Sequence, residues 1–138
     1  MITIYKSSET SLEKLEQLSP GSWLHAVAPT AAEIAQLQGQ LGVPQDFITY
    51  PLDIDERSRI EKEDGALLIV LRVPSFEGES ADIPYTTVPL GIILTPDYLV
   101  TVIGSDNDLM QELGSGKIRG LETSKRVRSA AVGSIVAA

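Results

Sequence analysis

The spacing of apolar and polar positions predicts a strand, a helix and a strand in the first part of the chain. Residues 1–5 alternate between apolar and polar side chains, which is the period of a β-strand. A helix is expected over residues 10–18, because Thr10 and Glu13 form a capping box and leucines follow at intervals of three. Residues 23–27 alternate again and predict a second strand.

Two helices are predicted next. Thr30 and Glu33 form another capping box, and the aliphatic residues that follow share one helical face, so a helix is expected up to Gly42. A short helix is predicted over residues 45–50, where Pro51 ends it.

The pattern then changes to that of a β-sheet. Residues 59–63 alternate, Asp64-Gly65 is typical of a hairpin turn, and residues 66–73 form an almost continuous apolar run. Such a run is typical of a central strand that is buried on both faces. Its alternate residues are expected on opposite faces of the sheet, each covered by helices: Leu67, Ile69 and Leu71 on one, Leu68 and Val70 on the other.

A polar surface loop is expected at residues 75–85, followed by strands at 86–95 and 98–103 and a helix at 105–113. The predicted fold class is mixed α/β, with a mixed β-sheet flanked by helices in the order β-α-β-α-α-β-β-β-β-α.

Composition removes several classes of function. The chain has 138 residues, which is typical of one domain. It has no Cys and a single His, so disulfide scaffolds, thiol nucleophiles and multi-histidine metal sites are excluded. No nucleophile or carboxylate stands near His25 in the sequence, which favours a histidine of the core. We therefore expect no catalytic residues and no enzyme.

Charge is distributed unevenly. The formal net charge is −8, but residues 1–116 carry 18 acidic and 6 basic side chains, whereas residues 117–138 carry 5 basic and 1 acidic. The acidic body makes nucleic acid an unsuitable partner. It is compatible with divalent cations, and the alternative is that the excess charge only confers solubility.

Membrane and phosphate motifs are absent from the sequence. The N-terminus lacks the pattern of a signal peptide, and the longest apolar run, residues 66–71, is far shorter than the roughly 20 residues of a membrane span. A cytosolic body is expected. Gly114-Ser115-Gly116-Lys117 lacks the preceding Gly and the following Ser or Thr of a phosphate loop, so a flexible helix exit is the preferred interpretation.

The densest polar segment is residues 53–59. Asp53 and Asp55 are the candidate metal ligands, because hard divalent cations such as Mg²⁺ prefer oxygen ligands. Arg57 and Arg59 can instead satisfy these acids as ion pairs. No other cofactor is expected.

The order of these segments resembles that of a known family. The quoted segments are Trp23 to Thr30 with Glu33, Gly42-Val43-Pro44, Asp53 to Glu61 with Leu67 to Pro74, and Pro89 to Val102. Together they closely resemble the cytoplasmic N-terminal domain of CorA-type magnesium and cobalt transporters. The resemblance covers residues 1–128 as one domain, and residues 129–138 are a tail that departs from the family pattern.

The resemblance implies the cytosolic wall of a homopentameric funnel, followed in the family by a stalk helix, two membrane spans and a Gly-Met-Asn motif. None of these parts occurs in this sequence, so the chain is expected to be a soluble fragment or truncated relative. The family also implies a regulatory divalent-cation site with an acidic pair at the end of the short helix. Thr49 and Tyr50 stand at those positions here, and Asp53 and Asp55 are the nearby substitutes.

Three functions follow from the sequence. The first is a regulatory, ion-sensing domain of a divalent-cation channel. The second is a structural domain that only packs subunits together and has no metal of its own. The third, a small cytosolic enzyme, is disfavoured by the lack of a recognisable nucleophile.

Overall fold

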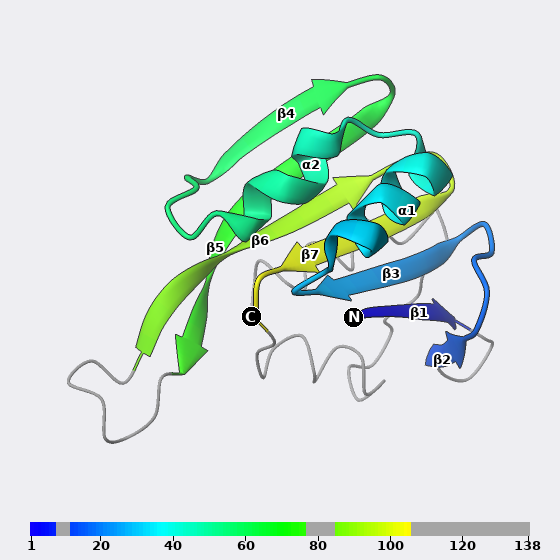
Figure 1. The fold of residues 1–138 in the computed structure, drawn as a ribbon, viewed down its shortest axis with the longest axis horizontal. Coiled ribbons are helices and arrows are strands. Elements are labelled where there is room, and N and C mark those ends of the chain that lie inside the picture. Colours follow the sequence, from blue (N-terminus) through cyan, green and yellow to red (C-terminus); the bar gives the residue numbers. More distant parts are fainter. Residues whose placement is uncertain (8–11, 77–84, 106–138) are drawn as a thin grey trace.

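The computed structural model describes residues 1–7, 12–76 and 85–105. Over these residues the chain forms one seven-stranded mixed sheet, with both described α-helices on the same face (Figure 1). The elements in chain order are β1 (Ile2–Ser7), β2 (Leu12–Leu15), β3 (Ser22–Val27), α1 (Ala31–Leu41), α2 (Gln45–Thr49), the 3₁₀ helix η1 (Tyr50–Leu52), β4 (Arg59–Glu63), β5 (Ala66–Phe76), β6 (Tyr85–Leu94) and β7 (Tyr98–Ile103).

The strands lie in the order β2-β1-β3-β7-β6-β5-β4. All neighbours are antiparallel except β3 and β7, which run parallel, with Trp23 opposite Leu99 and His25 opposite Thr101. The chain leaves the sheet after β3, forms the helices and three further strands, and returns to β3 only with β7. The mixed α/β class predicted from the sequence is confirmed.

The helix expected over residues 10–18 is wrong. Leu12–Leu15 is instead the edge strand β2, with Leu15 opposite Ile4 of β1. The leucines serve different faces of the sheet, since Leu12 packs against one hydrophobic cluster and Leu18 against the other. A helix would have placed them on one side, so the spacing of three leucines was overridden by strand pairing. Thr10 lies outside the described residues.

The two central helices are confirmed, with their predicted signals. Thr30 Oγ1 accepts a hydrogen bond from Glu33 N at 3.2 Å, and Glu33 Oε1 accepts one from Thr30 N at 3.0 Å. Gly42 ends α1 in the left-handed conformation, at φ 67°. Helical structure continues slightly further than expected, because α2 is followed directly by η1, and Pro51 lies inside η1 rather than after the helix.

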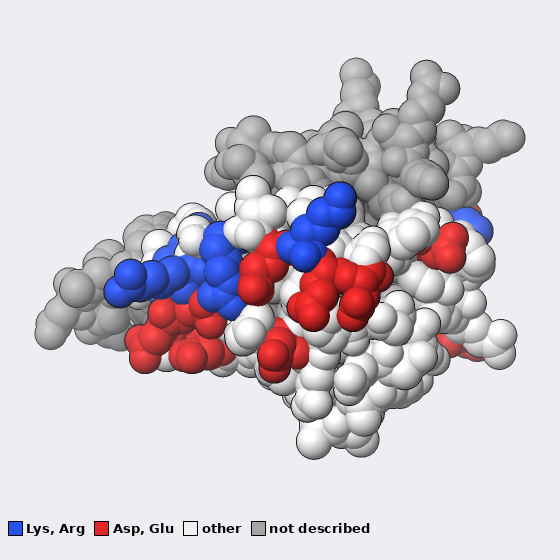
Figure 2. All heavy atoms as spheres, turned by 90° about the horizontal axis from the view of Figure 1, so that it is seen from above, with Lys and Arg blue, Asp and Glu red and all other residues white. Residues whose placement is uncertain are grey.

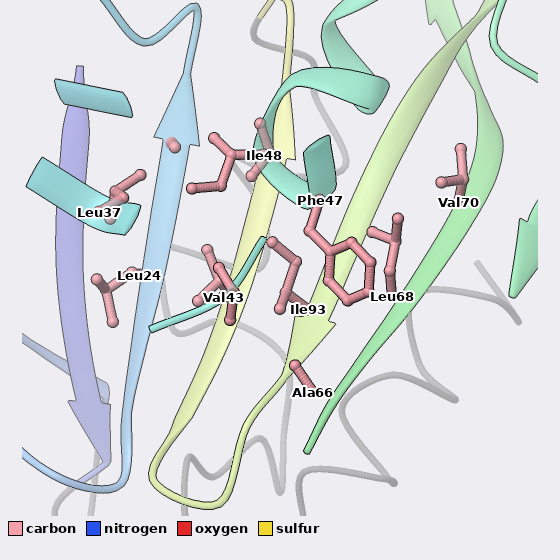
Figure 3. Packing of buried hydrophobic residues seen from close by; sticks show 12 residues of the cluster. Leu24, Leu37, Val43, Phe47, Ile48, Ala66, Leu68, Val70 and Ile93 are labelled. Carbon is pink, nitrogen blue, oxygen red and sulfur yellow. The ribbon is translucent and has the colours of Figure 1, made fainter. Parts of the chain in front are cut away.

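The helices cover one face of the sheet through a tightly packed core (Figure 3). Phe47 and Ile48 of α2 and Leu37 of α1 are almost completely buried against the strands. Each side chain of this size contributes about 1.5–3 kcal/mol when buried. The strand residues of the cluster are Leu24, Ala26, Ala66, Leu68, Val70, Ile93, Val100 and Val102.

The predicted alternation of residues 66–73 between the two faces of the sheet is confirmed. The expectation that helices cover both faces is not. Leu68 and Val70 face the helices, whereas Ile69 and Leu71 pack against the cluster on the opposite face. Among the described residues, no helix lies on that opposite face, because α1 and α2 follow each other on one side. The helix expected at residues 105–113 lies outside the described residues beyond Ser105.

The polar loop expected at residues 75–85 is wrong at its two ends, where Ser75 and Phe76 belong to β5 and Tyr85 to β6, and residues 77–84 lie outside the described residues. β5 and β6 continue as a hairpin arm up to the pair Phe76 and Tyr85. Strand β4 pairs with β5 only as far as Val70, so beyond this residue β6 is the one described strand that pairs with β5. An edge of this kind accepts proline, which explains why Pro74 did not end the strand.

Candidate functional site

The acidic turn, residues 53–58, connects η1 to β4 and is held by its own backbone. Asp53 N donates to Tyr50 O at 3.1 Å, and Glu56 N donates to Asp53 O at 3.0 Å. The side chain of Asp53 closes the turn, because its Oδ1 accepts from Asp55 N at 3.0 Å. Both aspartates are exposed. One carboxylate oxygen of Asp53 is therefore already engaged within the turn.

Arg72 of β5 fastens this turn to the sheet. Its Nη1 donates to the carbonyl oxygens of Ile54 at 3.0 Å and Glu56 at 2.9 Å. Its Nε and Nη2 donate to Oγ1 and O of Thr87 at 2.9 and 2.8 Å. One planar guanidinium thus joins two backbone carbonyls of the turn to strand β6.

Arg59, the first residue of β4, neutralises the acids beside the turn. Its Nη1 forms an ion pair with Glu56, and its Nε lies 3.4 Å from Glu61 Oε2. The side chains of Arg59 and Glu56 are 31% and 16% exposed, so this pair is partly shielded from solvent. Of the two arginines expected to satisfy the acids, Arg59 is the one that binds carboxylates through its side chain.

Tyr50 lies beneath the same guanidinium. The Cζ atom of Arg59 is 4.3 Å from the centre of the Tyr50 ring, a cation–π contact. The Tyr50 hydroxyl donates to Asp46 Oδ2 at 3.3 Å. The negative charge of Asp46, followed by burial and the charge of Glu61, raises the pKa of Tyr50, which remains a neutral hydrogen-bond donor.

We call Asp46, Tyr50, Glu56, Arg59 and Glu61 the Arg59 cluster. Figure 2 shows the face of the molecule around β4, where basic and acidic side chains are interleaved. Within the ranges that the structure describes, no three His, Cys, Asp or Glu side chains converge to hold a metal ion. Asp53 and Asp55 share one turn, and weak Mg²⁺ binding by them stays a prediction.

A group of buried polar side chains lies on the face of the sheet opposite the helices. Thr101 Oγ1 accepts a hydrogen bond from Trp23 Nε1 at 2.8 Å and lies 2.7 Å from His25 Nδ1. His25 is 6% exposed. It is a histidine of the core, as the sequence indicated. Lys117 and its glycine-rich segment lie outside the described residues.

A hollow of about 430 Å³ lies between α1 and the strands β1 and β3. Its floor is apolar, and its rim carries glutamines and two glutamates, Glu16 and Glu33. Glu33 is occupied by the cap of α1 and by the amino group of Met1, at 3.1 Å. Sequence patterns do not reveal this hollow, because its lining comes from segments far apart in the chain.

Sequence reasoning missed the roles of Arg72 and Tyr50. Arg72 left a signal, since it is the single charged residue within the apolar run of residues 66–73. The contact between Tyr50 and Arg59 left none, because it joins two elements that no periodic pattern relates.

The mixed sheet with two helices on one face, and with an acidic turn tied to it by Arg72, defines a mixed α/β domain. The chain belongs to the CorA-like Mg²⁺ transporter protein family, whose pattern it matches over residues 20–126. The family predicted from the sequence is thereby confirmed.

Individual proteins that are similar to this chain carry related names. The cobalt/magnesium transport protein CorA of Methanocaldococcus jannaschii is 26% identical over 106 residues, which cover 74% of this chain and 32% of that protein. The soluble domain of that CorA superimposes with a TM-score of 0.69 at 24% identity, covering 83% of this chain and 45% of the other. The ZntB cytoplasmic domain of Vibrio parahaemolyticus gives 0.63 at 16% identity, covering 82% and 47%. The structural likenesses establish the fold.

The chain spans about a third of the curated relative that it matches. None of the helices in the described residues has the length and apolar character that a membrane crossing requires.

Proposed function

We propose that the chain is the cytoplasmic regulatory domain of a CorA-like transporter of divalent cations, Mg²⁺ or Co²⁺. The observation that carries the proposal is the family match over residues 20–126. This range contains β3, both helices and strands β4 to β7, so the whole unit around the acidic turn lies within it. The domain acts on the cytoplasmic face of the membrane, to which segments outside this chain connect it.

Assembly into a homopentamer belongs to the same proposal. In this view the domain forms part of a funnel, and copies of the chain are its partners together with divalent cations. The net charge of −8 opposes close packing of copies. The isolated chain is therefore proposed to be mainly monomeric, with assembly driven by the segments outside it. Sedimentation in dilute buffer tests this, and a stable pentamer of the isolated chain would contradict it.

The proposed cation contact is weak Mg²⁺ binding at Asp53 and Asp55. Both carboxylates are exposed, and Arg72 fixes the backbone between them. With two carboxylates and retained waters, the Kd is on the order of millimolar. Melting in MgCl₂ is compared with NaCl at matched ionic strength, because screening of the net charge raises stability in both series. A Mg²⁺-specific shift is expected, and Asp53→Asn with Asp55→Asn should abolish it. A shift that survives both substitutions would place the cation elsewhere.

A structural domain that only packs subunits is the second candidate. The observation in its favour is that Arg59 neutralises Glu56 and Arg72 holds the backbone of the acidic turn. The two candidates differ in the melting comparison, since only the regulatory domain responds specifically to Mg²⁺.

The transport function is tested with the full gene product in bacteria that lack their own Mg²⁺ uptake. Growth at low Mg²⁺ and accumulation of Co²⁺ are the expected results. A gene product that reaches the membrane without uptake of either ion would overturn the transporter assignment.

A further inference from the structure

The divalent-cation site that the family implies does not fit the residues at the end of α2. Thr49 Oγ1 donates to Asp46 O at 3.5 Å, and the Tyr50 hydroxyl donates to the Asp46 carboxylate. Neither residue provides a carboxylate, which is the ligand that Mg²⁺ prefers. Thr49 and Tyr50 offer only neutral hydroxyl oxygens, which attract a divalent cation far less than carboxylates do.

The structure shows what stands beside these two residues instead. The Arg59 guanidinium lies over the Tyr50 ring and binds the carboxylates of Glu56 and Glu61. Arg59 comes from β4 and Tyr50 from the end of α2, so the guanidinium joins the two elements.

We propose that Arg59 supplies permanently the positive charge that a regulatory cation would supply at the end of α2, and that it excludes Mg²⁺ and Co²⁺ from this place. The inference deepens the proposed function, on which it rests. It means that Asp53 and Asp55, rather than the Arg59 cluster, carry the proposed cation response, and that the contact between α2 and β4 is independent of metal.

The exclusion follows from charge and geometry. A guanidinium cannot lose its proton in a protein, so its charge is present at every physiological pH. A divalent ion held between Glu56 and Glu61 would have to displace Arg59 from both carboxylates and from the Tyr50 ring. A neutral residue at position 59 would leave Glu56 and Glu61 without their cation, and Mg²⁺ is commonly held by one or two carboxylates together with waters.

The test removes the charge of Arg59 in a chain that also lacks the carboxylates of Asp53 and Asp55. Arg59→Gln is made in the Asp53→Asn, Asp55→Asn background, and its melting in MgCl₂ is compared with NaCl at matched ionic strength. Arg59→Gln is expected to acquire a Mg²⁺-specific rise in melting temperature and an apparent Kd about tenfold lower than its parent. Arg57→Gln is the matched control, because it removes the same charge from an exposed neighbour and should show no gain.

Two further variants separate charge from folding. Arg59→Lys keeps the cation and should not gain Mg²⁺ binding. If Arg59→Gln does not fold, Arg59→Met keeps the length of the stem over Tyr50 and carries the same expectation. Folded neutral variants without any Mg²⁺-specific gain, or with the same gain in Arg57→Gln, would overturn the inference.

The unaltered chain provides a second measurement. Paramagnetic Co²⁺ broadens NMR signals near its binding place, so the amides of residues 53–55 should broaden first as Co²⁺ is added. Side-chain signals of Tyr50 and Glu61 should broaden less than these amides at each Co²⁺ concentration, because Tyr50 adjoins the turn but does not bind the ion. Preferential broadening at Tyr50 would overturn the inference. Because neither measurement involves transport, failure here leaves the uptake result standing, and failure of uptake leaves these results standing.

Discussion

The ring of Pro51 packs directly on the backbone of Gly91, in the middle of β6. A Cβ atom placed on Gly91 would lie 2.1 Å from Cγ and 2.9 Å from Cβ of Pro51, well inside contact distance. Gly91 stands between Val70 of β5 and Val102 of β7, so the contact is at the centre of the sheet. Because Gly91 has no side chain, Pro51 of η1 can pack against the strand at this position. Tyr50 precedes Pro51 in η1, and the acidic turn follows η1.

Gly91→Ala is expected to lower the free energy of unfolding by about 1–3 kcal/mol, because a rigid proline ring must move out of a packed core. Urea denaturation measures the loss. Gly39→Ala is the control, since Gly39 is exposed within α1 and a Cβ there meets nothing within 4 Å. It should stabilise the chain by about 0.5–1 kcal/mol. Equal effects of the two substitutions would contradict the contact, and Pro51→Ala should partly rescue Gly91→Ala.

The two faces of β5 should respond unequally to truncation. Leu68 is completely buried beneath the helices, whereas Ile69 is only partly buried on the opposite face. Leu68→Ala is expected to cost about 2–5 kcal/mol, and Ile69→Ala less. Ile60→Ala should change stability by less than about 0.5 kcal/mol, because Ile60 is 69% exposed at the sheet edge. A larger loss at Ile69 than at Leu68 would mean that the helix-free side of the described sheet carries the main core.

Arg72 should be irreplaceable by lysine. Arg72→Lys and Arg72→Gln are each expected to lower the free energy of unfolding by about 1–2 kcal/mol, since neither can reproduce four hydrogen bonds from one planar group. Lys62→Gln, an exposed change on β4, is the control and should be nearly neutral. If lysine restored full stability, charge rather than geometry would hold the turn.

Glu33 should make the free energy of unfolding depend on pH in the acid range. Its pKa is lowered by the hydrogen bond from Thr30 N and by the amino group of Met1. Because the folded pKa lies below the unfolded one, the stabilisation is complete above about pH 4.5 and is lost as the pH falls through the folded pKa. The stability difference between the native chain and Glu33→Gln should therefore be constant near neutrality and shrink below pH 4.5. Urea denaturation at several pH values measures it, and a difference that does not depend on pH would contradict the prediction.

The elements that the sequence predicted correctly are those whose signals are local. Thr30 with Glu33 marked a helix start, and Asp64-Gly65 marked a hairpin whose two residues both have positive φ, at 53° and 79°. The run of residues 66–73 contained both faces of β5. These features depend on neighbours in the chain, so pattern alone was sufficient.

Non-local features were missed because their partners are distant. β2 is a strand only because β1 pairs with it, which three evenly spaced leucines could not indicate. At the candidate site, the sequence expected arginines to pair with Asp53 and Asp55, whereas Arg59 pairs with Glu56 and Glu61. Sequence patterns also could not reveal the stacking of Arg59 on Tyr50. The contact of Pro51 with Gly91 could not be predicted either, because a glycine within a strand does not indicate which residue packs against it.

The parallel pairing of β3 and β7 also fixes the order in which the chain can fold. Strands β4, β5 and β6 are joined by consecutive antiparallel pairing and can associate soon after they are synthesised. The group of β1, β2 and β3 has no neighbour to join until β7 appears, because β7 alone links the two groups. Closure of so long a segment is slow. During synthesis on the ribosome, β3 therefore cannot pair with β7 until residues 98–103 have been made. In this interval the nascent domain is most exposed to misassociation with other copies.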